Sequence, residues 1–131
     1  MIGLDTNVIV RYLTRDDERQ FKLAEAAIQT ALQSGEQLYL CTAVLLETVW
    51  VLERVYSADR SGVATLIQRL LETASFELEN EPLVEAALDA YQLGNADFAD
   101  YVIALGNRAS GCRYTLTFDR RATRFEGFKP I

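Results

Sequence analysis

Four acidic residues stand where carboxylates could act together. Asp5 follows a short apolar stretch and Glu47 lies within a long one, while Asp100 ends the motif Asp-Phe-Ala-Asp and Asp119 ends Thr-Phe-Asp. Two ionised carboxylates about 4 to 5 Å apart repel each other by roughly 3 to 4 kcal/mol at an effective dielectric constant of about 20. Four of them in one pocket therefore need a compensating cation, and a divalent metal ion is the simplest one.

The chain contains no histidine, which limits the chemistry available to it. Imidazole general bases, Ser-His-Asp triads, histidine-based zinc motifs and two-histidine ribonuclease chemistry are all excluded. Cys41 and Cys112 form no metal-binding pair, and we expect both to be buried thiols without a function. Any catalysis must therefore use the carboxylates.

The net charge of −6 argues against general coating of nucleic acid, but the charge is unevenly distributed. Residues 72–100 hold eight acids and no base, whereas the segment from Arg108 onward is basic. The basic residues of this segment are Arg108, Arg113, Arg120, Arg121, Arg124 and Lys129. Two readings stay open for them: a local phosphate-binding edge, or an ordinary solvated surface.

Alternating short strands and helices predict the α/β class. We expect strands near residues 2–4, 38–41, 76–78, 114–118 and 128–131, with amphipathic or buried helices between them. Such an order is typical of a mainly parallel sheet covered on both faces. Ligands of these sheets bind beyond the carboxyl ends of the strands, where Asp5 and Asp119 are expected. The 131 residues fit a single domain, 1–131, with no segment that could span a membrane. A cytoplasmic location follows by default.

Each carboxylate also has a structural explanation. Asp5 could cap the following helix, and Asp119 could be a turn residue or cap a short helix after it. Glu47 has only apolar residues three and four positions away, so we expect it to face the interior and to need a cation or a distant arginine. Asp97 and Asp100 stand one turn apart in a helix that we expect Asn95 to cap, with Asp100 as a ligand and Asp97 as auxiliary.

Short polar side chains accompany these acids. Thr6, Asn7 and Thr117 carry hydroxyl or amide groups that could orient a carboxylate, hold a water molecule bound to a metal, or contact a phosphate. We therefore predict them as supporting residues of the site.

In its motifs the chain resembles the PIN-domain ribonucleases, and among them the VapC-type toxins of toxin–antitoxin pairs. The resemblance rests on Met-Ile-Gly-Leu-Asp-Thr-Asn at residues 1–7, Glu47 in its apolar helix, Asp-Phe-Ala-Asp-Tyr-Val-Ile-Ala at 97–104 and Thr-Phe-Asp at 117–119. The set covers essentially the whole chain in the order that the family shows. Tyr101 departs from the family, where a small residue often follows the third acid, and we expect it to alter the mouth of the pocket.

The resemblance implies a PIN-like three-layer α/β/α fold with a central, mainly parallel sheet of four to five strands. It also implies an endoribonuclease that depends on Mg²⁺ or Mn²⁺, with Asp5, Glu47, Asp100 and Asp119 as catalytic residues and metal ligands and Asp97 as a further possible ligand. Water activated by the metal would attack an RNA phosphodiester in line, leaving a 5′ phosphate and a 3′ hydroxyl.

The same family implies partners for the chain. These are an RNA substrate, with transfer or ribosomal RNA suggested by the family alone, a cognate antitoxin that inhibits the enzyme, and a second copy in a homodimer. Candidate interface residues lie on two helices, although core packing is the simpler role for most of them: Trp50, Val51, Tyr56, Leu66 and Leu70.

Three other functions compete with this one, and the sequence argues against the first two. A receiver-like regulatory domain has a similar size and an acidic magnesium pocket, but it needs a lysine after a late strand, and only Lys22 and Lys129 exist. A haloacid-type phosphatase needs a second aspartate where this chain has Asn7. A non-catalytic module that binds metal without turnover is the third.

Overall fold

The computed structural model describes all residues, Met1–Ile131. The chain divides into two compact units, which we call unit 1, Met1–Glu79, and unit 2, Asn80–Ile131. Every helix falls short of the length and apolar character needed to cross a membrane.

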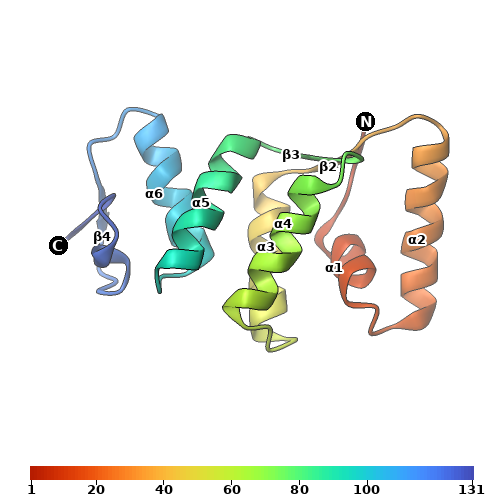
Figure 1. Cartoon of the computed structure of the whole chain (residues 1–131), viewed down its shortest axis with the longest axis horizontal. Helices are drawn as coiled ribbons and strands as arrows, with labels where there is room; N and C mark the ends of the chain where they lie inside the picture. Colours follow the sequence, from red (N-terminus) through yellow and green to blue (C-terminus); the bar gives the residue numbers. More distant parts are fainter. The chain divides into compact units, whose positions relative to one another are not determined.

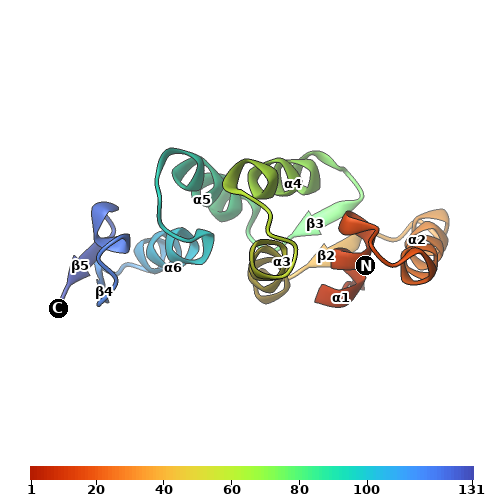
Figure 2. The same ribbon diagram turned by 90° about the horizontal axis from the view of Figure 1, so that it is seen from below.

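Unit 1 is built on a parallel sheet. Its elements are β1 (Ile2–Gly3), α1 (Thr6–Thr14), α2 (Glu18–Gln33), β2 (Leu38–Leu40), α3 (Thr42–Arg54), α4 (Arg60–Glu72) and β3 (Phe76–Leu78). Strand β2 lies between the other two, with Leu38 opposite both Ile2 and Phe76. Figure 2 shows α4 on one side of β2 and β3 and α1 on the other.

Local sequence signals explain where the helices of unit 1 begin. The carboxylate of Asp17 accepts a hydrogen bond from the backbone N–H of Gln20 at 2.9 Å, and Asp59 accepts one from Gly62 at 2.7 Å. Both are N-cap bonds, which satisfy N–H groups that the helix itself leaves unpaired. Helix α1 packs beside α2 (Figure 1), and apolar residues from the helices and from β2 and β3 fill the core.

Unit 2 contains α5 (Glu81–Leu93), α6 (Phe98–Ala109), β4 (Thr115–Thr117), the short 3₁₀ helix η1 (Ala122–Arg124) and β5 (Phe128–Pro130). Helices α5 and α6 pack side by side (Figure 1), and the rings of Tyr91 and Phe98 meet edge to face with their centroids 5.7 Å apart. Strands β4 and β5 pair in parallel, with Thr115 opposite Phe128.

The predicted α/β class and the parallel strands are confirmed. All five expected strands form and every pairing is parallel. The hydrogen bonds join them as two sheets, a three-stranded one in unit 1 and a two-stranded one in unit 2, where the sequence analysis expects one sheet. Alternating apolar residues identify a strand but do not indicate which strand it pairs with, so the division into two sheets could not be predicted from the sequence pattern.

Some smaller expectations are wrong. Helix α6 is capped by Asp97 and begins at Phe98, so Asn95 is not its cap. Cys112 is exposed and Cys41 only partly buried, because Cys112 lies in the turn that follows α6. Of the candidate interface residues, Leu70 belongs to the core at 3% exposure, whereas Trp50 is 58% exposed.

Candidate active site

Asp5 occupies the N-cap position of α1, directly after β1. Its backbone carbonyl accepts hydrogen bonds from Val8 and Ile9, at 3.1 and 3.2 Å, but its side chain makes no capping hydrogen bond. The carboxylate is exposed. Capping therefore does not account for an acidic side chain at this position, and the carboxylate is available for chemistry.

The two residues after Asp5 take different positions. Thr6 is buried at 4% exposure, whereas the side chain of Asn7 is exposed and lines a groove between α1 and α2. Asn7 is thus the better placed of the two to meet a ligand at the surface.

Glu47 lies in α3 and is exposed, so the expectation that it faces the interior is wrong. The buried face of α3 consists of Leu45, Thr48, Val49 and Leu52. The helix is apolar nearly all round, so the neighbours three and four positions from Glu47 could not indicate which face is buried; Trp50 among them is itself exposed. The N-terminus of α3 is held by Glu79, whose carboxylate accepts a hydrogen bond from the backbone of Thr42 at 2.7 Å.

In unit 2, Asp97 and Asp100 form the start of α6. The backbone N–H of Asp97 donates to the Asp100 carboxylate at 3.2 Å, an arrangement that stabilises the first turn. Partial burial raises the pKa of Asp100, and the negative charges of Asp97 and Asp119 raise it further, while the Asp97 N–H and the charge of Arg121 act in the opposite direction.

Asp119 is held in the turn after β4. Its backbone N–H donates to the Thr117 hydroxyl at 3.0 Å, and its carboxylate accepts from the backbone N–H groups of Arg121 and Ala122 at 2.8 and 3.4 Å. The predicted turn role of Asp119 is therefore confirmed, whereas the N-cap position of η1 belongs to Arg121. Thr117 orients the backbone beside the acid. The charge of Asp119 acts on Asp100, so these two acids of unit 2 interact electrostatically although they come from separate elements.

The donor chemistry of this cluster fits a hard divalent cation. Asp100 and Asp119 offer oxygen ligands only, and their mutual repulsion is what a cation would relieve. In neither unit do three or more His, Cys, Asp or Glu side chains already form a set of ligands around one point. Asp5 and Glu47 belong to unit 1, and the other acids belong to unit 2.

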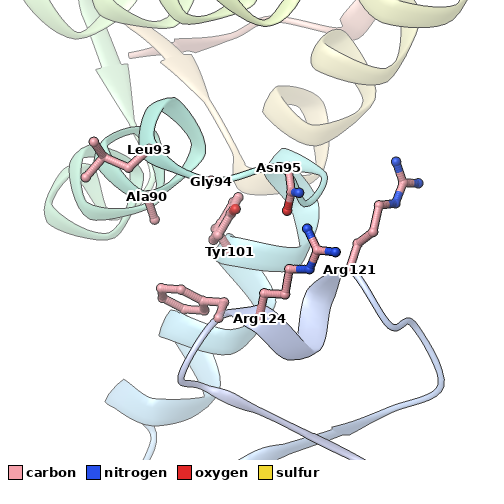
Figure 3. Close-up of a pocket in the computed structure, with 8 residues that line it drawn as sticks. Ala90, Leu93, Gly94, Asn95, Tyr101, Arg121 and Arg124 are labelled. Carbon is pink, nitrogen blue, oxygen red and sulfur yellow. The ribbon is translucent and has the colours of Figure 1, made fainter.

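A pocket of about 240 Å³ opens in unit 2 (Figure 3). Its lining includes Gly94, Asn95, Tyr101, Arg121, Arg124 and Phe125. Tyr101 is 3% exposed and forms a wall of this pocket. The Tyr101 hydroxyl accepts a hydrogen bond from the N–H of Ala96 at 3.2 Å.

Gly94 is a further residue that shapes this pocket. A Cβ atom at this position would stand 1.9 Å from the Tyr101 hydroxyl oxygen, so only glycine leaves room for that side chain. The sequence offers no signal for this contact, because Gly94 ends a helix and reads there as an ordinary C-terminal glycine.

Comparisons with known proteins agree with this α/β fold. The family model described as the PIN domain matches residues 2–127. The chain is also 26% identical over 128 residues to a VapC ribonuclease of Aquifex aeolicus strain VF5, an alignment that covers 98% of this chain and 93% of the relative. The predicted resemblance is therefore confirmed, and the chain belongs to the PIN-domain family.

Proposed function

We propose that this chain is an endoribonuclease toxin of the VapC type, a hydrolase that acts on RNA phosphodiester bonds. The observation that carries the proposal is the electrostatic interaction of Asp100 in α6 with Asp119 in the turn after β4, in a chain of the PIN-domain family. The similarity to a VapC ribonuclease along 98% of the chain supports the substrate class. Membership of this family argues against a receiver-like domain.

The catalytic residues in this proposal are Asp5, Glu47, Asp100 and Asp119. Their order along the chain supports the assignment, and so does the exposure of Asp5 and Glu47, whose carboxylates are open to solvent. Because the family match runs without a break from residue 2 to 127, we treat residues 1–131 as one functional domain. Asp97 has an auxiliary role.

The proposed cofactor is Mg²⁺ or Mn²⁺, held by these carboxylates. When bound, such an ion supplies charge neutralisation and a lower pKa for water at the site. The donor set contains oxygen alone, which suits these hard cations better than softer metals.

The side chains have the remaining tasks. With no histidine in the chain, carboxylates must accept the proton of the attacking water, and the exposed Glu47 and Asp5 are suited to this. Thr117 fixes the backbone of Asp119, while the exposed amide of Asn7 and the hydroxyl of Thr6 support Asp5. Attack on phosphorus by water rather than by a ribose hydroxyl leaves a 5′ phosphate and a 3′ hydroxyl. A cyclic 2′,3′ phosphate product would contradict this mechanism.

The proposal includes regulation. A cognate antitoxin would inhibit the enzyme, a homodimer would be the active assembly, and the cytoplasm would be the compartment, since cellular RNA is the substrate. The exposed Trp50 in unit 1 offers one apolar side chain that such a protein partner could cover.

Cleavage of total cellular RNA tests the function. The purified chain, separated from any partner, is incubated with Mg²⁺ or Mn²⁺, alongside an EDTA control and an Asp5→Asn variant. Discrete fragments that need the metal and are absent with the variant are expected. Binding of Mn²⁺ without any cleavage would instead favour a non-catalytic metal-binding module, and failure to bind the metal would overturn the proposed cofactor.

A further inference from the structure

We propose that Arg121 and Arg124 form a subsite in the unit 2 pocket for a backbone phosphate of single-stranded RNA, next to the phosphate that is cleaved. This inference rests on the proposed function and names how the substrate is held.

The two arginines line the same pocket. Arg121 precedes η1 and Arg124 ends it, and residues three positions apart in a 3₁₀ turn lie on the same side. Figure 3 shows both side chains extending in the same direction, with that of Arg124 beside Asn95 and Tyr101. Two planar guanidinium groups at one pocket match the geometry of phosphate oxygens, which arginine binds through paired hydrogen bonds.

Neither arginine is paired directly with an acid, although the charge of Arg121 acts on Asp100. Their guanidinium groups form no hydrogen bond or ion pair, whereas Arg108 in the same basic segment lies 3.8 Å from a carboxylate oxygen of Glu126. The pocket therefore presents two cationic groups whose hydrogen-bond donors are free. An anion is the ligand that such a pocket favours.

The remainder of the pocket is firmly built. The ring of Tyr101 meets that of Phe125 edge to face, with centroids 5.1 Å apart and planes at 84°. Gly94 lies against the Tyr101 hydroxyl, which also accepts the Ala96 hydrogen bond. A wall held at both its ring and its hydroxyl keeps the pocket open without a ligand, so less ordering is needed when one binds.

The position of the pocket indicates which anion it binds. The backbone N–H of Arg121 donates to the carboxylate of Asp119 at 2.8 Å. Arg121, which lines the pocket, is therefore in direct contact with one of the acids. A phosphate in the pocket would thus be adjacent to one at the acids, as consecutive phosphates of one RNA strand are. The exposed Leu93 at the rim gives an apolar surface for the attached nucleoside.

RNA binding without cleavage tests the subsite. The full chain is titrated in EDTA against a fluorescent single-stranded RNA, and the affinity is read by anisotropy for wild type, Arg121→Ala, Arg124→Ala and the double variant. The control is Arg120→Ala, which removes the same charge from the residue just before Arg121, and Arg120 does not line the pocket. We expect about 5- to 10-fold weaker binding for each pocket variant and less than about 2-fold for the control.

The salt dependence gives a second reading. The double variant should lower the slope of log affinity against log salt by about 0.7, the value for one phosphate contact on a single strand. An RNA with one neutral methylphosphonate, moved along the strand, should weaken wild type at one position and leave the double variant unaffected there. Equal losses for Arg120→Ala and the pocket variants, or no sensitive position, would overturn the subsite.

Cleavage assays separate this inference from the proposed function. The pocket variants should raise KM with kcat within about 3-fold of wild type, because they lose binding and not chemistry. If Asp5→Asn abolishes cleavage while the pocket variants bind RNA normally, the nuclease stands and the subsite fails. If the pocket variants lose binding in a chain that does not cleave RNA, the subsite stands without the nuclease.

Discussion

The acids of unit 1 and those of unit 2 differ in what surrounds them. Asp5 and Glu47 are exposed. At the start of α1 only the backbone carbonyl of Asp5 accepts hydrogen bonds, and its side chain accepts none. Asp100 and Asp119 both accept backbone hydrogen bonds that shape their own elements. Substitutions in unit 1 therefore test chemistry alone, whereas those in unit 2 change chemistry and local structure together.

The largest expected effect is a loss of activity when an acid is neutralised, and the acids of unit 1 should show it without a loss of stability. Asp5→Asn and Glu47→Gln should each lower cleavage at least about 100-fold, since each removes a charge that the proposed chemistry needs. Neither should change the melting temperature, because neither carboxylate supports the fold. Cleavage rates and thermal unfolding are measured side by side, with Glu25→Gln, an exposed acid of α2, as the control. If Asp5→Asn or Glu47→Gln lost stability together with activity, the difference between the acids of unit 1 and those of unit 2 would be contradicted.

A glycine from each unit sharpens the comparison in terms of stability. Gly94→Ala would place a Cβ 1.9 Å from the Tyr101 hydroxyl and 3.1 Å from the carbonyl oxygen of Ala90, so we expect a loss of about 1 to 3 kcal/mol in unfolding free energy. Gly3→Ala in β1 meets nothing within 4 Å and should stay within about 0.5 kcal/mol of wild type. Denaturant titration measures both.

A partial rescue identifies the contact responsible. Adding Tyr101→Phe to Gly94→Ala removes the nearest atom, so part of the stability should return. If Gly94→Ala were neutral from the start, the close packing of Tyr101 would not be a constraint on this pocket.

Residue types and their order predicted much of this molecule, but they did not predict orientation. The five strands, the parallel pairing and the family followed from periodicity and motifs. The orientation of Glu47 could not be predicted, because α3 has apolar residues on every face and their spacing does not indicate which face is buried. The N-cap of α6 could not be fixed from the sequence either, because Asn95 and Asp97 are both good N-cap residues and stand only two positions apart.

The pocket of unit 2 lay further beyond sequence reasoning. The basic segment suggested a phosphate-binding edge, but six basic residues were equal candidates. Only the fold selects Arg121 and Arg124 from them, because η1 sets their spacing and Tyr101 and Gly94 build the wall beside them. Contacts between residues on separate elements depend on packing, which local sequence patterns do not encode.

Asp119 tests the double role of the unit 2 acids. Asp119→Ala removes the acceptor for the N–H groups of Arg121 and Ala122 and should cost about 1 kcal/mol of stability. Asp119→Asn keeps an oxygen acceptor and should cost less. Both should abolish cleavage, since both lose the charge. Chemical unfolding and RNA cleavage of the two variants separate the roles, and equal stability of the two would show that the hydrogen bonds to the Asp119 carboxylate do not stabilise the turn.

Asp100 gives the smallest expected effect and a distinct dependence on pH. Its pKa is raised above the ordinary value of 3.8, chiefly by burial and then by the charges of Asp97 and Asp119. The folded chain thus binds this proton more tightly than the unfolded chain does. The stability that results is present below about pH 3.8 and is lost as the pH rises through the folded pKa.

At neutral pH, therefore, ionised Asp100 opposes folding, and Asp100→Asn should stabilise the metal-free chain even though it abolishes cleavage. The gain should be less than about 1 kcal/mol, because solvent screens a partly exposed group. Unfolding in EDTA at a series of pH values measures it, and the advantage of the variant should shrink as the pH falls toward 3.8. Added Mn²⁺ should reverse the ranking, since a bound cation favours the ionised wild type. If Asp100→Asn were less stable than wild type without metal, the hydrogen bond that the Asp100 carboxylate accepts at the start of α6 would outweigh the cost of its charge.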